Sequence, residues 1–193
     1  MIRNKSDLQR YLAMDRFALE RKEKHPRFLG DYVFKFEIAL RHHEYYHNLV
    51  CSGKNGIFNK LMLYWWRYWH HRLGLRLGFT IPVNTIDGGL RINHYGLIIV
   101  NENARIGKYC DIHQGVNIGM QGSSNLDCPT IGDNVWIGPG AKIFGRIIIG
   151  DNCQIGANAV VNKDFTENGI TIAGIPAKKI SNHSNPYARN YLI

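Results

Sequence analysis

A repeat with a period of six residues limits the fold more than any other feature of this sequence. Ile or Val occupies all ten positions of a register that steps by six and is interrupted by one thirteen-residue step: Val100, Ile106, Ile112, Ile118, Ile131, Ile137, Ile143, Ile149, Ile155 and Val161. Six of the ten residues that follow these positions are Gly, and the fifth position of most hexads is small or apolar. Helices repeat about every 3.6 residues and ordinary strands about every 2. Unrelated short strands with Gly turns would not keep one register, so the pattern predicts a β-helix with three hexads in each coil.

The thirteen-residue step indicates a loop that leaves the coil. The step from Ile118 to Ile131 equals one hexad plus seven residues, and the register resumes beyond it. We therefore expect a β-helix over residues 79–180 with an extruded loop at 120–130, followed by a C-terminal tail at 181–193. Loops that interrupt a regular scaffold often carry function.

Residues 1–78 show a different, helical pattern. We expect helices over 6–22, 31–50 and 57–77, with Ser6 as a candidate N-cap. The third segment contains the run YWWRYW at 64–69. Two interpretations of this run stay open: burial in a helical or subunit interface, and contact with an anionic membrane surface through Trp, Tyr and Arg.

The charge is concentrated in the helical part. Residues 1–80 hold 15 basic and 7 acidic residues, whereas residues 81–193 hold 9 and 8, out of a net charge of +9. No helix-turn-helix, zinc-finger or RNA-binding signature accompanies the charge, so nucleic acid is not the expected partner. No apolar run is long enough for a membrane span, and the N-terminus lacks a signal peptide. We therefore expect a cytoplasmic protein, with an inner membrane face as the alternative site.

The cysteines and the clustered histidines do not indicate a metal site. Cys51, Cys110, Cys128 and Cys153 form no CxxC pair, so we expect reduced thiols that pack as small apolar groups. Five histidines have ligand-like spacing but lack a completing Cys or paired carboxylates, and we expect them to be packed or solvated: His42, His43, His47, His70 and His71.

The repeat carries further motifs in a definite order: GLRINHYGLIIVNENARIG at 89–107, IHQGVNIG at 112–119, PTIGDNVWIGPGAKIFG at 129–145, IGANAVVNKD at 155–164 and AGIPAKKI at 173–180. Through them the segment 81–180 resembles the hexapeptide-repeat acyltransferases, whose fold is a left-handed β-helix. Within that family it is most similar to serine acetyltransferases and to O-acetyltransferases of surface-polysaccharide clusters. The resemblance implies acetyl-CoA as donor, a homotrimer with active sites between subunits, and, through the N-terminal helices, a dimer of trimers as a further assembly.

Two histidines are the expected catalytic residues. His94 falls where the family has its general base, and imidazole titrates near neutral pH, as deprotonation of an attacking hydroxyl requires. His113 takes a corner position that is usually Gly, so its side chain should project outward at the same edge, one coil along. We expect His113 to support catalysis or to bind the acceptor.

The expected acceptor residues depart from the serine acetyltransferase pattern. Asn93 stands where those enzymes have Asp, and Asp127-Cys128 stands where they have Arg-His in the loop. Thr80 lies near the place of the acid that orients the family histidine. Because an amino acid favours an acid and a cation in its site, the sequence predicts a sugar hydroxyl of surface-polysaccharide synthesis as acceptor. Serine of cysteine biosynthesis is the alternative, and a non-catalytic β-helix scaffold is the third reading.

The donor side matches the family pattern more closely. The resemblance places pantetheine along small residues and CoA phosphates near lysines, and the residues expected to bind acetyl-CoA are Gly138, Pro139, Ala141, Gly156, Ala157, Lys163 and Lys178. No metal is expected in the site.

Overall fold

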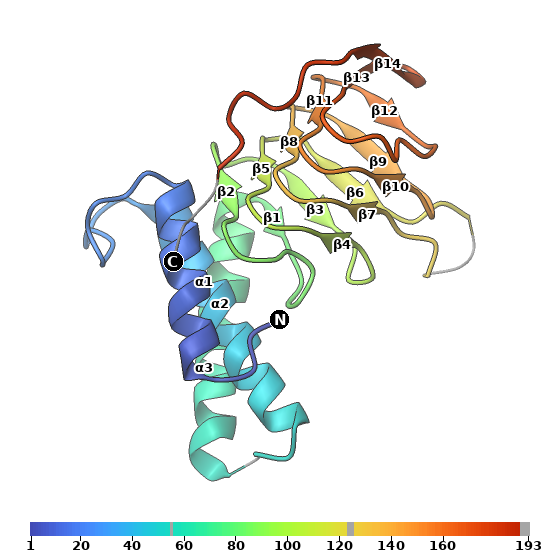
Figure 1. Cartoon of the computed structure of the whole chain (residues 1–193). Helices are drawn as coiled ribbons and strands as arrows, with labels where there is room; N and C mark the ends of the chain where they lie inside the picture. Colours follow the sequence, from blue (N-terminus) through green and yellow to red (C-terminus); the bar gives the residue numbers. More distant parts are fainter. Residues whose placement is uncertain (55, 123–125, 190–193) are drawn as a thin grey trace.

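The computed structural model describes residues 1–54, 56–122 and 126–189. Three helices come first, α1 (Lys5–Ala18), α2 (Tyr32–Cys51) and α3 (Ile57–Leu77). They form a helical arm that extends away from a stack of β-coils (Figure 1). The three expected helices are present, but the predicted N-cap was wrong. Asn4 caps α1, and its side-chain oxygen accepts from the Asp7 amide at 2.9 Å.

The strands form three sheets that make the sides of a left-handed β-helix. The six-stranded sheet has the order β14-β13-β11-β8-β5-β2, comprising Ala177–Ser181, Thr171–Gly174, Gln154–Ile155, Trp136–Ile137, Asp111–Ile112 and Arg91–Ile92. The five-stranded sheet has the order β1-β3-β6-β9-β12, comprising Phe79–Thr80, Ile98–Val100, Asn117–Gly119, Lys142–Phe144 and Val160–Val161. The three-stranded sheet has the order β10-β7-β4, comprising Ile148–Ile149, Thr130–Ile131 and Arg105–Ile106. All named pairs are parallel except β13–β14.

The hexad register defines the core, as the sequence predicts. Every one of the ten aliphatic positions is buried, at 4% exposure or less. Strand pairing stacks these residues on one another, for example Ile112 on Ile137 and Ile137 on Ile155. The small fifth positions close the core at the corners, and Cys110 and Cys153 are among them. None of the four cysteines is disulfide-bonded.

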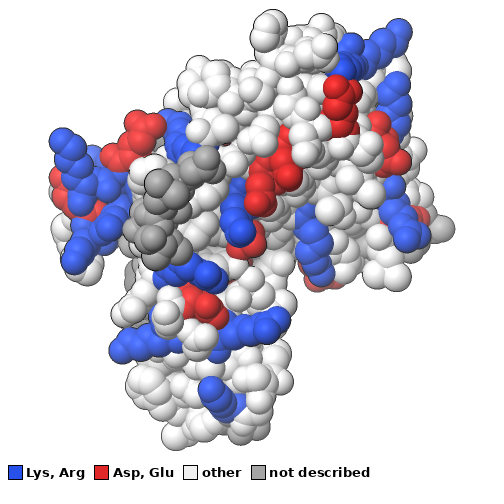
Figure 2. Space-filling model, in the orientation of Figure 1, with Lys and Arg blue, Asp and Glu red and all other residues white. Residues whose placement is uncertain are grey.

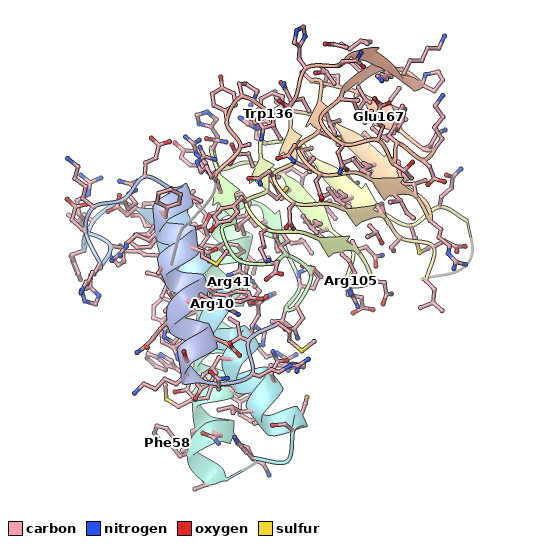
Figure 3. All side chains as sticks on the ribbon, viewed as in Figure 1. Arg10, Arg41, Phe58, Arg105, Trp136 and Glu167 are labelled. Atoms are coloured by element: carbon pink, nitrogen blue, oxygen red, sulfur yellow. The ribbon has the colours of Figure 1, made fainter. Side chains whose placement is uncertain are left out.

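A buried ion cluster joins the helical arm to the first coil. Arg41 of α2 is fully buried and lies between the arm and the β-helix (Figure 3). Its guanidinium donates to Asp15 of α1 at 2.7 Å and to Glu44 at 2.9 Å, and also to the backbone carbonyls of Ile86 and Asp87 at 2.8 Å. Arg41 thus joins α1 to α2 through the Asp15 carboxylate and joins the arm to the coil through the two carbonyls.

The C-terminal tail crosses the outer face of the six-stranded sheet. The Ser184 and His183 carbonyls accept from the side chains of Gln154 and Thr171 at 2.7 and 2.9 Å. Asn185 is buried and donates to the Asn134 carbonyl at 2.9 Å. The last four residues of the expected tail lie outside the described residues, as do residues 123–125 of the expected loop. No helix in the described part of the chain is long and apolar enough to cross a membrane.

Candidate functional site

The sheet topology gathers most of the expected site residues at one corner. The chain passes from the six-stranded to the five-stranded sheet once in each coil, directly after β2, β5, β8 and β11. We call this edge the histidine corner, formed by residues 93–94, 113–114, 138–139, 156–157 and 173–174. Because hexads from successive coils stack in register, residues far apart in the sequence become neighbours here.

His113 has a fixed position in this corner. Its Nδ1 lies 3.0 Å from the Ile137 carbonyl oxygen on the next coil, and its ring packs 4.7 Å from the ring of Trp136. A carbonyl only accepts, so Nδ1 carries the proton and Nε2 holds a lone pair in the neutral ring. Burial lowers the pKa of His113, against the opposing effect of the Ile137 hydrogen bond. The arrangement therefore keeps His113 neutral and able to accept a proton at neutral pH.

His94 lies on the adjoining coil and is exposed. Its ring centroid is 6.5 Å from that of His113, with the planes tilted by 54°. It makes no hydrogen bond with any described residue, so no carboxylate in this part of the chain orients it. Thr80, which stands near the expected place of an acid, is an exposed residue of β1 and pairs with Ile99.

Most of the expected donor residues lie at the histidine corner. Gly138, Pro139, Gly156 and Ala157 continue the histidine corner above His113, and Lys178 pairs with Ala173 at its far end. Gly138 cannot carry a side chain, because a Cβ there would lie 2.8 Å from the Ala157 nitrogen. Gly138 itself is buried by this close stacking, whereas Pro139 and Gly156 are half-buried and Ala157 is exposed, so these three residues form the accessible surface of this part of the corner.

Two expected donor residues lie elsewhere. Ala141 is fully buried, because it fills a small fifth position of the hexad, so only its backbone could line a site. Lys163 follows β12 at the corner between the five-stranded and three-stranded sheets, where its ammonium lies 5.5 Å from the Phe165 ring centre. Within one chain, the side chains of these two residues therefore do not join the other expected donor residues at the histidine corner, and the expected donor role of each stays a prediction.

The expected acceptor residues are also divided. Asn93 is half-buried beside His94, and its backbone N–H donates to the Ile112 carbonyl at 3.2 Å. Asp127 and Cys128 lie on the segment that joins β6 to β7, which is a different corner of the same coil stack. Cys128 is buried among core residues, so its side chain is not available to an acceptor. Within one chain, Asp127 and Cys128 therefore do not lie at the same corner as His94.

A charged cluster beside His113 was not anticipated from the sequence. Asp111 is buried, and Arg189 of the tail donates to its two oxygens at 2.9 and 3.1 Å. Arg91 lies 3.7 Å from Asp111 and 3.5 Å from Glu20. Burial raises the pKa of Asp111, against the effect of the two arginines. One sequence signal could have indicated this cluster. The residue directly before each core aliphatic residue lies on the outer side of the coil, and Arg91, Asp111 and Trp136 hold that position on three neighbouring strands.

The histidines of the arm pack against their neighbours. His43 Nδ1 lies 3.0 Å from His70 Nδ1, and His42 stacks on Trp66 with ring centroids 4.2 Å apart. Among the described residues, no group of three His, Cys, Asp or Glu side chains could hold a metal ion.

Comparisons with known proteins agree with the fold. Residues 128–163 match the family model for the bacterial transferase hexapeptide (six repeats). A serine acetyltransferase of Synechococcus elongatus is 42% identical over 100 residues, which are 51% of this chain and 41% of the relative. One of Helicobacter pylori strain J99 is 40% identical over 101 residues, which are 52% of this chain and 58% of the relative. The matched region thus spans only about half the length of these curated relatives.

Solved structures match nearly the whole chain. The crystal structure of a serine acetyltransferase from Brucella abortus strain S19 superposes with a TM-score of 0.71 at 28% identity, covering 94% of this chain and 72% of that one. A crystal structure of serine acetyltransferase from the same strain in complex with coenzyme A gives a TM-score of 0.66 at 30% identity, covering 93% and 70%. The helical arm is therefore included in the structural similarity.

Proposed function

The chain belongs to the serine acetyltransferase family of hexapeptide-repeat transferases, and from that premise we propose that it transfers an acetyl group from acetyl-CoA to a hydroxyl group. The observation that carries the proposal is the pair of His94 and His113 at the start of the histidine corner, below a run of small residues. A non-catalytic scaffold would need neither this pair of histidines nor the small residues that follow it along the corner.

The chemistry requires one base that later acts as an acid. As the hydroxyl oxygen attacks the thioester carbonyl carbon, an imidazole takes the hydroxyl proton, and a tetrahedral intermediate forms. Collapse breaks the carbon–sulfur bond, and the same imidazolium protonates the leaving thiolate. We assign the base to His94, and assign His113, whose ring is fixed by Ile137 and Trp136, to holding the acceptor beside it.

Acetyl-CoA is the donor in this proposal, and the histidine corner supplies its path. The relative from Brucella abortus was solved in complex with coenzyme A. In this chain the half-buried Gly156 and the exposed Ala157 present no large side chain to pantetheine, and Lys178 at the far end of the corner offers a cation to the CoA phosphates.

Serine is the acceptor that the comparisons favour over a sugar. The relatives and structures described above are serine acetyltransferases, including the one from Synechococcus elongatus. A sugar hydroxyl remains the second candidate because Asn93 replaces an acid with an amide and Asp127-Cys128 supplies no cation. These departures concern the groups that bind the acceptor, and the transfer chemistry is the same for both.

The two acceptors can be separated in one experiment. Purified chain is incubated with acetyl-CoA and either L-serine or a panel of hexoses and nucleotide sugars, with thiol release as the rate and mass spectrometry for the product. We expect O-acetylserine as the product. The His94→Ala variant serves as the negative control. Thiol release with a sugar and none above background with serine would select the second candidate, and no release with any acceptor would contradict the transferase.

We also propose that three copies assemble around the β-helix, with the active site between neighbours. Asp127 and Lys163 lie at the corner between the five-stranded and three-stranded sheets, away from the histidine corner of their own chain. In a threefold arrangement that corner can complete the histidine corner of an adjacent subunit. Sedimentation velocity of the purified chain tests this directly, since a monomer would leave both residues without a site.

A further inference from the structure

The outer face of α3 is the strongest feature that the proposed activity does not use. From Tyr45 to Ile86 the sequence contains no Asp or Glu but five basic residues, Lys54, Lys60, Arg67, Arg72 and Arg76. The same stretch contains three of the four tryptophans of the chain. We propose that this face binds the surface of an anionic lipid bilayer.

α3 is amphipathic in an unusual sense, because its larger apolar face points to solvent. Exposed apolar and aromatic residues three or four positions apart form one stripe along the helix, which Arg72 continues to Leu75; the apolar and aromatic members are Ile57, Leu61, Tyr64, Trp65, Tyr68, Trp69 and Leu75. Phe58 extends the stripe at the end of the arm farthest from the β-helix (Figure 3) and is 65% exposed. Trp65 and Leu75 are 55% and 71% exposed. A contiguous exposed apolar surface of this kind indicates a partner.

The basic residues are placed around this stripe and lack acidic partners. Arg72 falls within the stripe by helical spacing, and Lys60 and Arg67 fall along one edge of it. None of these three forms an ion pair with a described residue. In Figure 2 the lower end of the helical arm shows Lys and Arg atoms without Asp or Glu, whereas the β-helix above it shows both.

A hollow beside the stripe continues the apolar surface. It has a volume of about 400 Å³ between α2 and α3, and Trp65, Trp66 and Trp69 line it together with Lys35. Trp and Tyr rings are suited to the headgroup level of a bilayer, with apolar side chains below and basic side chains on the phosphates. The face therefore matches an interfacial helix in composition and in layout.

Charge decides between a bilayer and a second copy of the chain. A twofold contact brings the same face of both copies together. Arg72 and its basic neighbours would then meet their own counterparts, and no acid of this stretch could neutralise them. An anionic bilayer supplies the missing negative charge, and each basic residue near it changes partitioning by roughly fivefold.

The test is flotation of the full chain with vesicles of phosphatidylcholine containing phosphatidylglycerol, and with phosphatidylcholine alone. We expect flotation with the anionic vesicles at low salt, and loss of it at high salt or with neutral vesicles. Arg67→Gln/Arg72→Gln should weaken partitioning by roughly twenty-five-fold, as the loss of two charges predicts. The matched control Lys108→Gln/Arg146→Gln removes two exposed charges from the β-helix and should change partitioning less than about twofold.

A second readout tests which side chains enter the bilayer. Tryptophan emission should shift to shorter wavelength on vesicle addition in the wild type, and Trp65→Ala/Trp69→Ala should abolish the shift. No flotation with anionic vesicles at low salt, or equal losses in the α3 and control variants, would overturn the proposal. If the wild type does not bind vesicles and Arg67→Gln/Arg72→Gln changes the mass of the assembly in sedimentation velocity, this face is instead a contact between copies of the chain. None of these outcomes depends on acetyltransferase activity.

Discussion

At the residue scale, the two histidines of the site differ in how they are held. His113 is fixed by the Ile137 carbonyl and by Trp136, whereas His94 is exposed and contacts the His113 ring at 6.5 Å between centroids. A fixed ring can position a substrate atom, and a mobile exposed ring can move with the proton it takes. The division of roles between them can therefore be measured by changing each alone.

His94→Ala should leave the chain folded and lower kcat by roughly 10²–10⁴, the usual contribution of a positioned general base. The fold should survive because the side chain makes no hydrogen bond in the described part of the chain. Steady-state thiol release measures the effect, with the exposed His25→Ala as a matched control that should keep wild-type turnover. Near-wild-type turnover of the His94 variant would remove it from the mechanism.

The acceptor KM should report the neutral form of His113, which holds the acceptor in the proposed mechanism. Because burial lowers the pKa of His113, the acceptor KM should stay level down to about pH 6.5, the ordinary histidine value, and rise only below it. His113→Asn should raise the acceptor KM and remove this rise at low pH. An unchanged KM with the same pH dependence in wild type and variant would show that His113 does not hold the acceptor.

At the element scale, the coil depends on its aliphatic columns. Ile137→Asp on β8 places a carboxylate in a fully buried position between Ile112 and Ile155, where it has no water and no partner. We expect no folded protein. Ile148→Asp on β10 is the matched control, because Ile148 is 52% exposed, and it should remain folded. Circular dichroism and melting curves distinguish the two, and a wild-type melting temperature for Ile137→Asp would refute the register.

The coil was predictable because its information is local. Each hexad specifies its own aliphatic position, so Val100 to Val161 could be assigned to the core without knowing any partner. The accessibility of single side chains was harder to predict than the register. Ala141 and Cys128 belong to the core, so only the backbone of Ala141 can line a site, and the side chain of Cys128 is enclosed.

Contacts between distant segments could not be predicted in this way. The pairing of Arg189 with Asp111 joins residues 78 positions apart, and Arg41 reaches carbonyls of the coil 45 positions away. No periodic signal records such pairs. The sequence indicated the histidine corner through the spacing of His94 and His113, but not the cluster beside it.

The α2–α3 hairpin should be sensitive to acid through two histidines. Burial lowers the pKa of His43 to about 4 and that of His70 to about 3. The unfolded chain therefore binds these protons first, and the stability they contribute, present above about pH 6.5, is lost as pH falls. The loss is at most about 1.4 kcal/mol per pH unit for each histidine, and smaller for the less buried His43.

His43→Asn/His70→Asn isolates this effect. Its free energy of unfolding in urea should decline less than that of the wild type between about pH 6.5 and pH 4.5, with His25→Asn as the exposed control. Burial raises the pKa of Glu37 and of Glu44, which gives the opposite slope, but both acids are present in all three proteins and cancel. Parallel pH curves for wild type and double variant would contradict the assignment.

At the scale of the whole molecule, the arm and the coil are joined by charged groups as well as by apolar contacts. Asp15 of α1 accepts from Arg41 and also from the Gly89 and Leu90 amides at 2.7 and 2.9 Å. Those amides precede β2 by one or two residues, and β2 leads directly to His94. The arm thereby fixes the start of the strand that carries the catalytic histidine.

Arg41→Met should consequently damage both stability and catalysis. Asp15 and Glu44 are buried, and without Arg41 they keep their desolvation cost and lose their partner, which costs about 3–5 kcal/mol in comparable buried pairs. Urea unfolding measures this loss. The control Arg10→Met removes an arginine that pairs with Asp7 at 3.4 Å on the surface of α1 and should cost less than about 1 kcal/mol. At urea-free conditions where Arg41→Met is still folded, kcat should fall because the segment before His94 has lost its anchor. Wild-type kcat in that folded variant would show that the arm stabilises the coil without positioning its active site.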